Sequence, residues 1–185
     1  MFRCLSAVRV VLVFGLVASV SSLTVAGPLH EAAWHSDLAQ VKTLVATGHD
    51  VNARDRSGDT PLQRAAVAGA TEIVLFLLDN GARVDTKGDA AGATPLNASA
   101  RNGHVATSKL LVQRGANVNN KGHLGTTPVM GAVLANSLEL VGFLLERGAD
   151  PNIRNNLGVS PLGIATGQKD STKMVDLLKR YGAKE

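Results

Sequence analysis

Apolar residues gather in five short runs along the chain, and each run has the composition and length of one amphipathic helix. The runs are VKTLVA from Val41, IVLFLLD from Ile73, SKLLVQ from Ser108, LVGFLLE from Leu140 and MVDLLKR from Met174. Polar segments rich in glycine separate them. We interpret each run as a helix that buries its apolar side against neighbouring elements.

A second set of segments lies ahead of the apolar runs and fixes the period. These are GPLHEAA, TPLQRAA, TPLNASA, TPVMGAV and SPLGIAT, beginning at residues 27, 60, 94, 127 and 160. Their prolines are 33, 34, 33 and 33 residues apart. A fixed period of this length is typical of stacked repeats, in which each repeat buries its apolar face on the next.

Local chemistry supports the same division. A Thr or Ser stands before four of the prolines, where a hydroxyl can accept an orphan N–H at a helix start, and proline suits the first helical position. These hydroxyls belong to Thr60, Thr94, Thr127 and Ser160. A glycine ends each later apolar run, where a left-handed residue is wanted. These glycines are Gly81, Gly115, Gly148 and Gly182.

The period and the motifs together resemble the ankyrin repeat over essentially all of residues 28–185. The resemblance implies an all-α solenoid of about five helix-turn-helix repeats with protruding β-hairpin loops. The expected domain covers 27–185, with repeats at about 27–58, 59–92, 93–125, 126–158 and 159–185.

Residues 1–26 have a different character and are expected to be a secretory signal peptide. Arg3 and Arg9 precede an apolar run at 10–20, and small residues, including Ala26, precede Gly27. This is the order of a basic region, an apolar region and a cleavage site. An uncleaved membrane anchor is the alternative. We expect export across an inner membrane to the periplasm of a Gram-negative bacterium, with no membrane insertion after cleavage.

Composition removes several classes of function. Cleavage would take Arg3, Arg9 and the single cysteine, Cys4, leaving 17 basic and 15 acidic residues and a net charge of +2. The mature chain would then have no disulfide and no thiolate. Aromatic residues make up only 3% of the chain, so a nucleic-acid partner is not expected.

The segment HEAAWH, residues 30–35, superficially resembles a zinc-protease motif. Its histidines are five residues apart, however, which rotates them by roughly 140° around a helix, whereas the metal motif needs a separation of four. The resemblance instead places His30 at the histidine position of the repeat, which implies a structural hydrogen bond. No catalytic set, metal site or cofactor site is predicted, and the chain is not expected to be an enzyme.

In the family that the chain resembles, the variable concave surface binds partners. The expected partner-binding residues lie on the first helices and loop tips: Trp34, Arg56, Arg101, Asn102, His123, Leu124, Leu134, Asn156 and Leu157. Trp34 could instead cover the open end of the stack, and the two loop leucines could pack on the next hairpin. A basic row, at 54, 87, 121 and 154, could meet an acidic partner or simply serve the scaffold.

The expected function is that of a non-enzymatic, monomeric protein-binding module of the cell envelope. Its partner would be an exported envelope enzyme, which the module inhibits or protects against. The alternative is a periplasmic scaffold or stress-protection adaptor, for example one that supports a peroxide-detoxifying enzyme.

Overall fold

A computed structural model describes residues 27–88, 92–169 and 171–185. The predicted signal peptide at 1–26 lies outside these ranges. The described residues contain ten α-helices in five consecutive pairs and no strand. The prediction of an all-α solenoid is confirmed. The helices are α1 (Pro28–Trp34), α2 (Leu38–Ala46), α3 (Pro61–Ala68), α4 (Thr71–Asp79), α5 (Pro95–Arg101), α6 (Val105–Gln113), α7 (Pro128–Leu134), α8 (Leu138–Glu146), α9 (Pro161–Thr166) and α10 (Thr172–Arg180).

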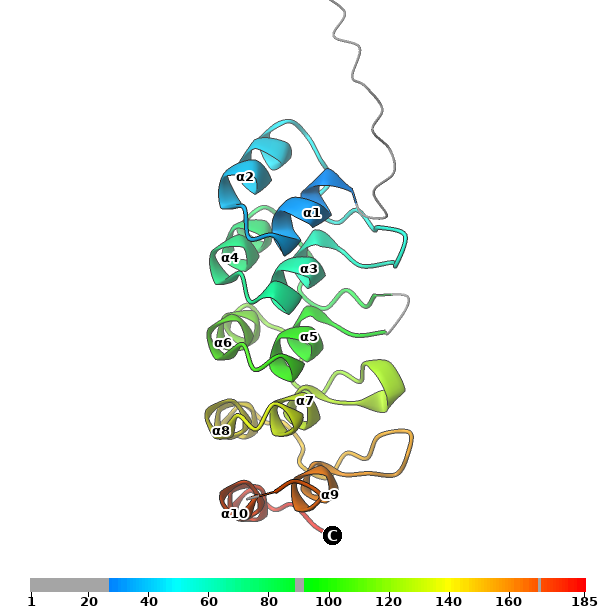
Figure 1. The fold of residues 1–185 in the computed structure, drawn as a ribbon, viewed down its shortest axis with the longest axis vertical. Coiled ribbons are helices and arrows are strands. Elements are labelled where there is room, and N and C mark those ends of the chain that lie inside the picture. The colour runs from blue at the N-terminus through cyan, green and yellow to red at the C-terminus, as the bar shows by residue number, and fades with distance from the viewer. Residues whose placement is uncertain (1–26, 89–91, 170) are drawn as a thin grey trace, which may run out of the picture.

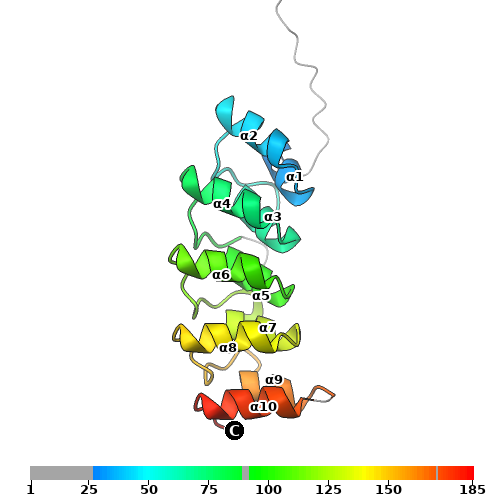
Figure 2. The same ribbon diagram turned by 90° about the vertical axis from the view of Figure 1, so that its left-hand side faces the viewer.

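The pairs stack along one axis in chain order, which produces an elongated molecule of two helical layers (Figures 1 and 2). The first helices, α1, α3, α5, α7 and α9, pack on one another and form one layer, and the second helices form the other. Loops project from the first-helix layer, on the side away from the second helices (Figure 1). None of the helices in the described ranges is long and apolar enough to cross a membrane.

The core lies between the two layers and runs the length of the stack. Leu62, Leu77, Leu96, Leu111 and Leu144 are among its completely buried side chains. Alanines such as Ala65 and Ala132 are also fully buried, where neighbouring first helices approach closely. Apolar burial across successive repeats is the main source of stability in such a stack.

Helix starts follow the predicted chemistry with one exception. Thr60 Oγ1 accepts the N–H of Gln63 at 3.4 Å, and the Gln63 side chain accepts the Thr60 N–H at 2.8 Å, which completes a capping box. Thr94 and Ser160 also accept such a bond. Thr127 does not, and its buried hydroxyl has no hydrogen-bond partner among the described residues.

Helix ends were predicted correctly. Gly81, Gly115, Gly148 and Gly182 have φ values of 88°, 89°, 86° and 85°, in the left-handed region that only glycine adopts without strain. Each directly follows the capping residue of a second helix, and the first three turn the chain toward the next loop.

The protruding loops are tight turns in place of regular β-hairpins. Backbone hydrogen bonds close them. The N–H groups of Asp55 and Asn155 donate to the carbonyl oxygens of Asp59 and Val159, each at 3.0 Å, and that of Gly88 donates to Ala93 at 3.1 Å. In the loop that contains the short 3₁₀ helix η1 (His123–Gly125), the Gly122 N–H donates to the carbonyl oxygen of Thr126 at 2.8 Å. With so few paired groups, the described loops do not extend into ladders.

Three members of the basic row, Arg54, Lys121 and Arg154, hydrogen-bond to loop backbone. Arg54 donates to the carbonyl oxygen of Lys87 at 2.9 Å, and Lys121 donates to that of Arg154 at 3.3 Å. Arg54 and Arg154 each also donate to the carbonyl of a glycine in their own loop. These side chains therefore join one loop to the next.

Candidate functional site

The histidine of the opening motif is a structural residue. His30 is buried, and its Nε2 lies 3.0 Å from the carbonyl oxygen of Ala53 and 3.1 Å from that of Asp59. It therefore ties the first helix to the loop of the next repeat, as the resemblance implied. No group of three His, Cys, Asp or Glu side chains in the described ranges could hold a metal ion.

The same position ties loops to first helices in the next two repeats. Gln63 donates to the carbonyl oxygen of Ala93 at 2.7 Å, and Asn97 donates to those of Asn120 and Thr126 at 3.1 and 3.3 Å. These bonds hold each loop at a fixed angle to its helix. The surface between the first helices (α1, α3, α5, α7 and α9) and the loops that precede α3, α5, α7 and α9 therefore has a fixed shape. We call this surface the loop-side groove.

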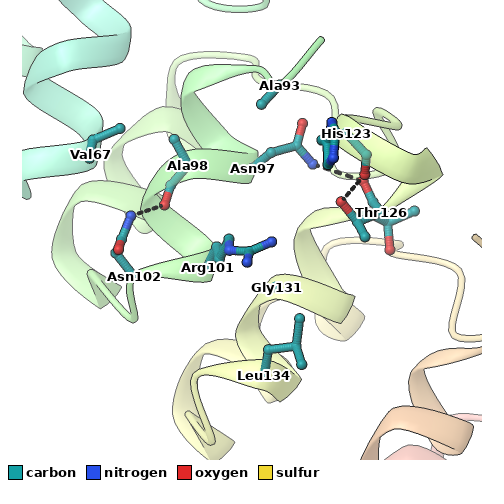
Figure 3. A pocket seen from close by; sticks show the side chains of 11 residues that line it. Val67, Ala93, Asn97, Ala98, Arg101, Asn102, His123, Thr126, Gly131 and Leu134 are labelled. Atoms are coloured by element: carbon teal, nitrogen blue, oxygen red, sulfur yellow. Dashed lines mark hydrogen bonds between the residues drawn. The ribbon is translucent and has the colours of Figure 1, made fainter. Parts of the chain in front are cut away.

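The loop-side groove deepens into a cavity of about 340 Å³ at the third and fourth repeats (Figure 3). Its walls come from the end of α3, from α5 and α7, and from the loops that precede α5 and α7. The lining residues are Val67, Ala93, Asn97, Ala98, Arg101, Asn102, His123, Thr126, Thr127, Gly131 and Leu134.

A change in residue size along the stack explains where the cavity lies. The position after the histidine column is occupied by Glu31 and Arg64 in the first two repeats, but by Ala98 and Gly131 in the next two. At Gly131 an added Cβ would lie only 3.0 Å from the backbone nitrogen of Arg101. Glycine therefore lets α7 approach α5, and the two small residues leave the groove open.

Two side chains that can donate hydrogen bonds, Arg101 and His123, lie at the cavity and make none with the described part of the chain. Arg101 is exposed, and its guanidinium makes no hydrogen bond or ion pair with any described residue. His123 is likewise exposed, and its ring makes no hydrogen bond to the described residues. Figure 3 shows the Arg101 side chain extending across α7 toward the loop that carries His123 and Thr126. The cavity can therefore supply several hydrogen-bond donors to a ligand.

Four of the residues predicted as partner-binding meet at this cavity. Arg101, Asn102, His123 and Leu134 come from two helices and one loop, and all four line it. Leu134 is 46% exposed, which is unusual for leucine at the end of a buried helix. The Asn102 side chain donates to the carbonyl oxygen of Ala98 at 2.9 Å, so it shapes the wall.

Trp34 lies outside the cavity, at the end of α1. Its side chain is 44% exposed, and the Arg64 guanidinium lies 5.9 Å from its ring centroid, a cation–π distance. Arg64 belongs to the second repeat, so the ring of Trp34 contacts the neighbouring repeat.

The loop tips present the four remaining predicted residues. Leu124 is 48% exposed and Leu157 is 72% exposed, so the neighbouring loops do not cover them. The two loops do touch, because the Asn156 N–H donates to the carbonyl oxygen of Leu124 at 2.8 Å. Arg56 is exposed at the tip of an earlier loop and does not line the cavity.

Arg64, a second arginine on a first helix, forms ion pairs with two carboxylates. Arg64 donates to the buried Asp55 carboxylate at 2.6 and 3.0 Å and lies 3.5 Å from Asp59. Burial alone would raise the pKa of Asp55, but hydrogen bonds from Arg64 and from two backbone N–H groups bring it below its ordinary value. Burial raises the pKa of Asp59, although Arg64 opposes the shift. Arg64 thus has a carboxylate partner, whereas Arg101 has none among the described residues.

The sequence predictions missed the floor of the cavity. Ala98 and Gly131 were not singled out, because small residues on a helix carry no chemistry of their own. Asn97 and Thr126 were missed because they act by holding the loop in place. At one position of the repeat, the side chain becomes smaller along the stack, from Glu31 and Arg64 to Ala98 and Gly131. This decrease in size was a signal in the sequence for a cavity at the third and fourth repeats.

Comparisons with known proteins agree with this architecture. A family model described as "Ankyrin repeats (3 copies)" matches residues 29–122, and one described as "Ankyrin repeats (many copies)" matches residues 111–165. The first of these alone spans about half of the chain.

Three curated proteins share shorter segments. The chain is 43% identical over 60 residues to the Tonsoku-like protein of Bos taurus, 41% over 61 residues to protein phosphatase 1 regulatory subunit 27 of Homo sapiens, and 42% over 50 residues to the potassium channel SKOR of Arabidopsis thaliana. These segments cover 32%, 33% and 27% of this chain, and 4%, 40% and 6% of the respective relatives. The chain thus matches less than half the length of each.

Proposed function

The chain belongs to the ankyrin-repeat family, whose repeats are generally non-enzymatic protein-binding modules, and we propose that it binds an exported enzyme through the loop-side groove. Binding would inhibit that enzyme or protect the cell envelope against it. The partner and the compartment are what we propose. A protein-binding scaffold is what ankyrin repeats generally supply.

Exposed apolar side chains in the groove carry the proposal. Of the large apolar residues that are well exposed in the described ranges, Trp34, Leu124, Leu134 and Leu157 lie on the first helices or loop tips. Apolar surface that remains in contact with water, close to polar groups, is typical of a protein-binding site. Tryptophan and arginine are also enriched among residues that contribute most to binding.

The choice of an enzyme as partner has support from a relative. The human protein is, by name, a regulatory subunit of a phosphatase, so a related ankyrin segment occurs in a protein assigned to an enzyme complex. The choice of the periplasm has support from residues 1–26, with their basic start, apolar middle and small residues before Gly27.

Affinity capture tests the proposal. The tagged full-length chain, expressed in a Gram-negative host that is shown to export it, would be used to capture proteins from the periplasmic fraction for identification by mass spectrometry. An exported hydrolase whose activity falls on addition of the purified chain supports inhibition. An oxidative-defence enzyme that keeps its activity longer in the presence of the chain would support the adaptor alternative instead.

The compartment has a separate test. N-terminal sequencing of the exported protein should find a start near Gly27 in the soluble periplasmic fraction. A start at Met1 or Phe2 on membrane-bound protein would contradict cleavage and favour the uncleaved anchor.

A further inference from the structure

We propose that the cavity at the third and fourth repeats recognises an extended acidic segment of the partner. A carboxylate of that segment binds Arg101, and an apolar side chain next to it packs on Leu134. This inference rests on the proposed function and adds the chemistry of what the groove binds.

The donors at the cavity match a carboxylate. The guanidinium of Arg101 has no hydrogen bond or ion pair with the described residues, and its planar set of N–H groups can hold both oxygens of a carboxylate. His123 lies on the facing loop and offers a second ring donor. Arg64 occupies a comparable helix face in the preceding repeat, but Asp55 already holds it at 2.6 Å. Of these two arginines, Arg101 is therefore the one without an acidic partner among the described residues.

The charge of the surrounding chain favours the same ligand. No Asp or Glu occurs between residues 91 and 138, a stretch that contains Arg101, Lys121 and His123. The next acidic residue, Glu139, lies on a second helix, where Lys109 pairs with it at 2.6 Å. The segment that supplies most of the cavity lining therefore contributes cations and no carboxylate, which favours both the encounter rate and the specificity of an acidic ligand.

The apolar part of the cavity decides between an acidic peptide and a nucleic acid. Val67, Ala98, Gly131 and Leu134 form an apolar wall, and no Phe, Tyr or Trp lines the cavity, so it lacks the large aromatic side chains on which successive nucleic-acid bases stack. The volume of about 340 Å³ is at the small end of protein ligand pockets, which span roughly 300–1,000 Å³. Both features fit one or two side chains of a peptide.

Selection from a library of random peptides displayed on phage tests this inference with the full-length chain as bait. Selected peptides should be enriched in Asp or Glu beside an apolar residue. Synthetic versions should bind about tenfold more weakly when the carboxylates are changed to amides, because a charge-assisted hydrogen bond is lost. Rising salt should also weaken binding.

Matched variants locate the peptide. Arg101→Glu and Ala98→Leu should each weaken binding about tenfold or more, the first by repelling the carboxylate and the second by filling the cavity. The controls are Arg83→Glu and Ala106→Leu, which make the same changes at exposed positions that do not line the cavity. Circular dichroism melting of all four variants checks that the stack is intact.

The outcomes separate this inference from the proposed function. Selected peptides that lack acidic enrichment but lose binding on Ala98→Leu would overturn the acidic chemistry and leave the groove as a binding face. The inference would be overturned if Arg83→Glu weakened peptide binding as much as Arg101→Glu does. It would also be overturned if the selection yielded no binders, or if the chain bound single-stranded DNA more tightly than acidic peptides. Loss of binding in Ala106→Leu, on the second-helix layer, without loss in Ala98→Leu would also contradict the proposed function.

Discussion

At the scale of single residues, two arginines of the first helices differ in whether a described carboxylate pairs with them. Arg64 and Arg101 lie on successive first helices and face the same side of the molecule, yet only Arg64 has an internal carboxylate. Asp55 is held there by the Arg64 guanidinium and by the N–H groups of Ser57 and Asp59. The ion pair therefore stabilises the loop that precedes α3, whereas Arg101 has no ion-pair partner among the described residues.

Replacing Asp55 with asparagine should lower the free energy of unfolding at neutral pH by about 1–3 kcal/mol, because buried hydrogen bonds lose their charged acceptor. The pKa of Asp55 is lowered in the folded protein, since the hydrogen bonds from Arg64 and the backbone outweigh its burial. A lowered folded-state pKa gives stability that is present above the ordinary value of 3.8 and is lost as the pH falls through the folded-state pKa. The difference between wild type and variant should therefore shrink at acidic pH, as measured by urea unfolding.

Asp59 titrates in the opposite sense and is coupled to the change. Its pKa is raised by burial, with Asp55 adding to the rise and Arg64 opposing it, so Asp55→Asn also lowers the pKa of Asp59 toward its ordinary value. The same comparison in an Asp59→Asn background isolates the contribution of Asp55. Asp176→Asn, at an exposed position of α10, is the matched control and should leave stability nearly unchanged at every pH. A wild type that equalled Asp55→Asn at neutral pH would show that the ion pair contributes nothing.

The candidate site shows what residue-level sequence reasoning can and cannot find. Arg101 and Leu134 were predicted because their columns are exposed on the first helices, and this exposure followed directly from the period. The cavity itself was not predicted, because its depth depends on how closely α7 approaches α5 at Gly131. That distance is a property of packing between repeats and has no motif in the sequence.

At the scale of elements, each helix is stabilised by one buried face and by its ends. In α4, Leu77 is completely buried, whereas Leu75, two residues earlier, is 37% exposed. Hydroxyl caps and left-handed glycines fix where the helices begin and end. These are local signals, so the helices and their order could be predicted from the sequence. The short form of the loops could not, because it depends on bonds to the next repeat, such as that from Gln63 to Ala93.

Leu77→Ala should destabilise the protein by roughly 2–5 kcal/mol, because it removes buried contacts and leaves a cavity between α4 and its neighbours. Leu75→Ala is the control on the same helix and should cost about 1 kcal/mol or less, since this side chain loses less contact. Guanidinium unfolding midpoints of the two variants measure the difference. Equal losses would mean that α4 does not bury the face seen in the structure.

At the scale of the whole molecule, the fold is a linear stack in which each first helix contacts the first helices beside it in the chain. Stability therefore arises from the interfaces between neighbouring repeats, and an inner repeat has an interface on both sides. The groove runs along this stack, so its shape depends on the stack staying intact. Surface changes in the groove can be tested separately from changes in the core.

The stack should hold together without a metal ion. A chelator should leave the melting temperature unchanged, because His30 is bonded to two backbone carbonyl groups and the described residues contain no cluster of metal ligands. A fall of several degrees on adding the chelator would reveal a structural metal, which contributes directly to folding free energy. Differential scanning calorimetry with and without chelator makes the measurement.

Partner capture by groove variants tests the central claim, that the loop-side groove binds another protein. Arg101→Ala, Leu124→Ala and Leu157→Asp should each weaken capture, and loss of a residue central to the contact should cost about 2 kcal/mol of binding or more. All three should melt within a few degrees of wild type, since surface changes usually cost within about 0.5 kcal/mol of stability. Glu72→Ala and Leu75→Ala, on the second-helix layer, should capture the partner normally. If the groove variants captured the partner as well as wild type while the Glu72 and Leu75 variants lost it without unfolding, the binding face would be the second-helix layer and the claim would be wrong.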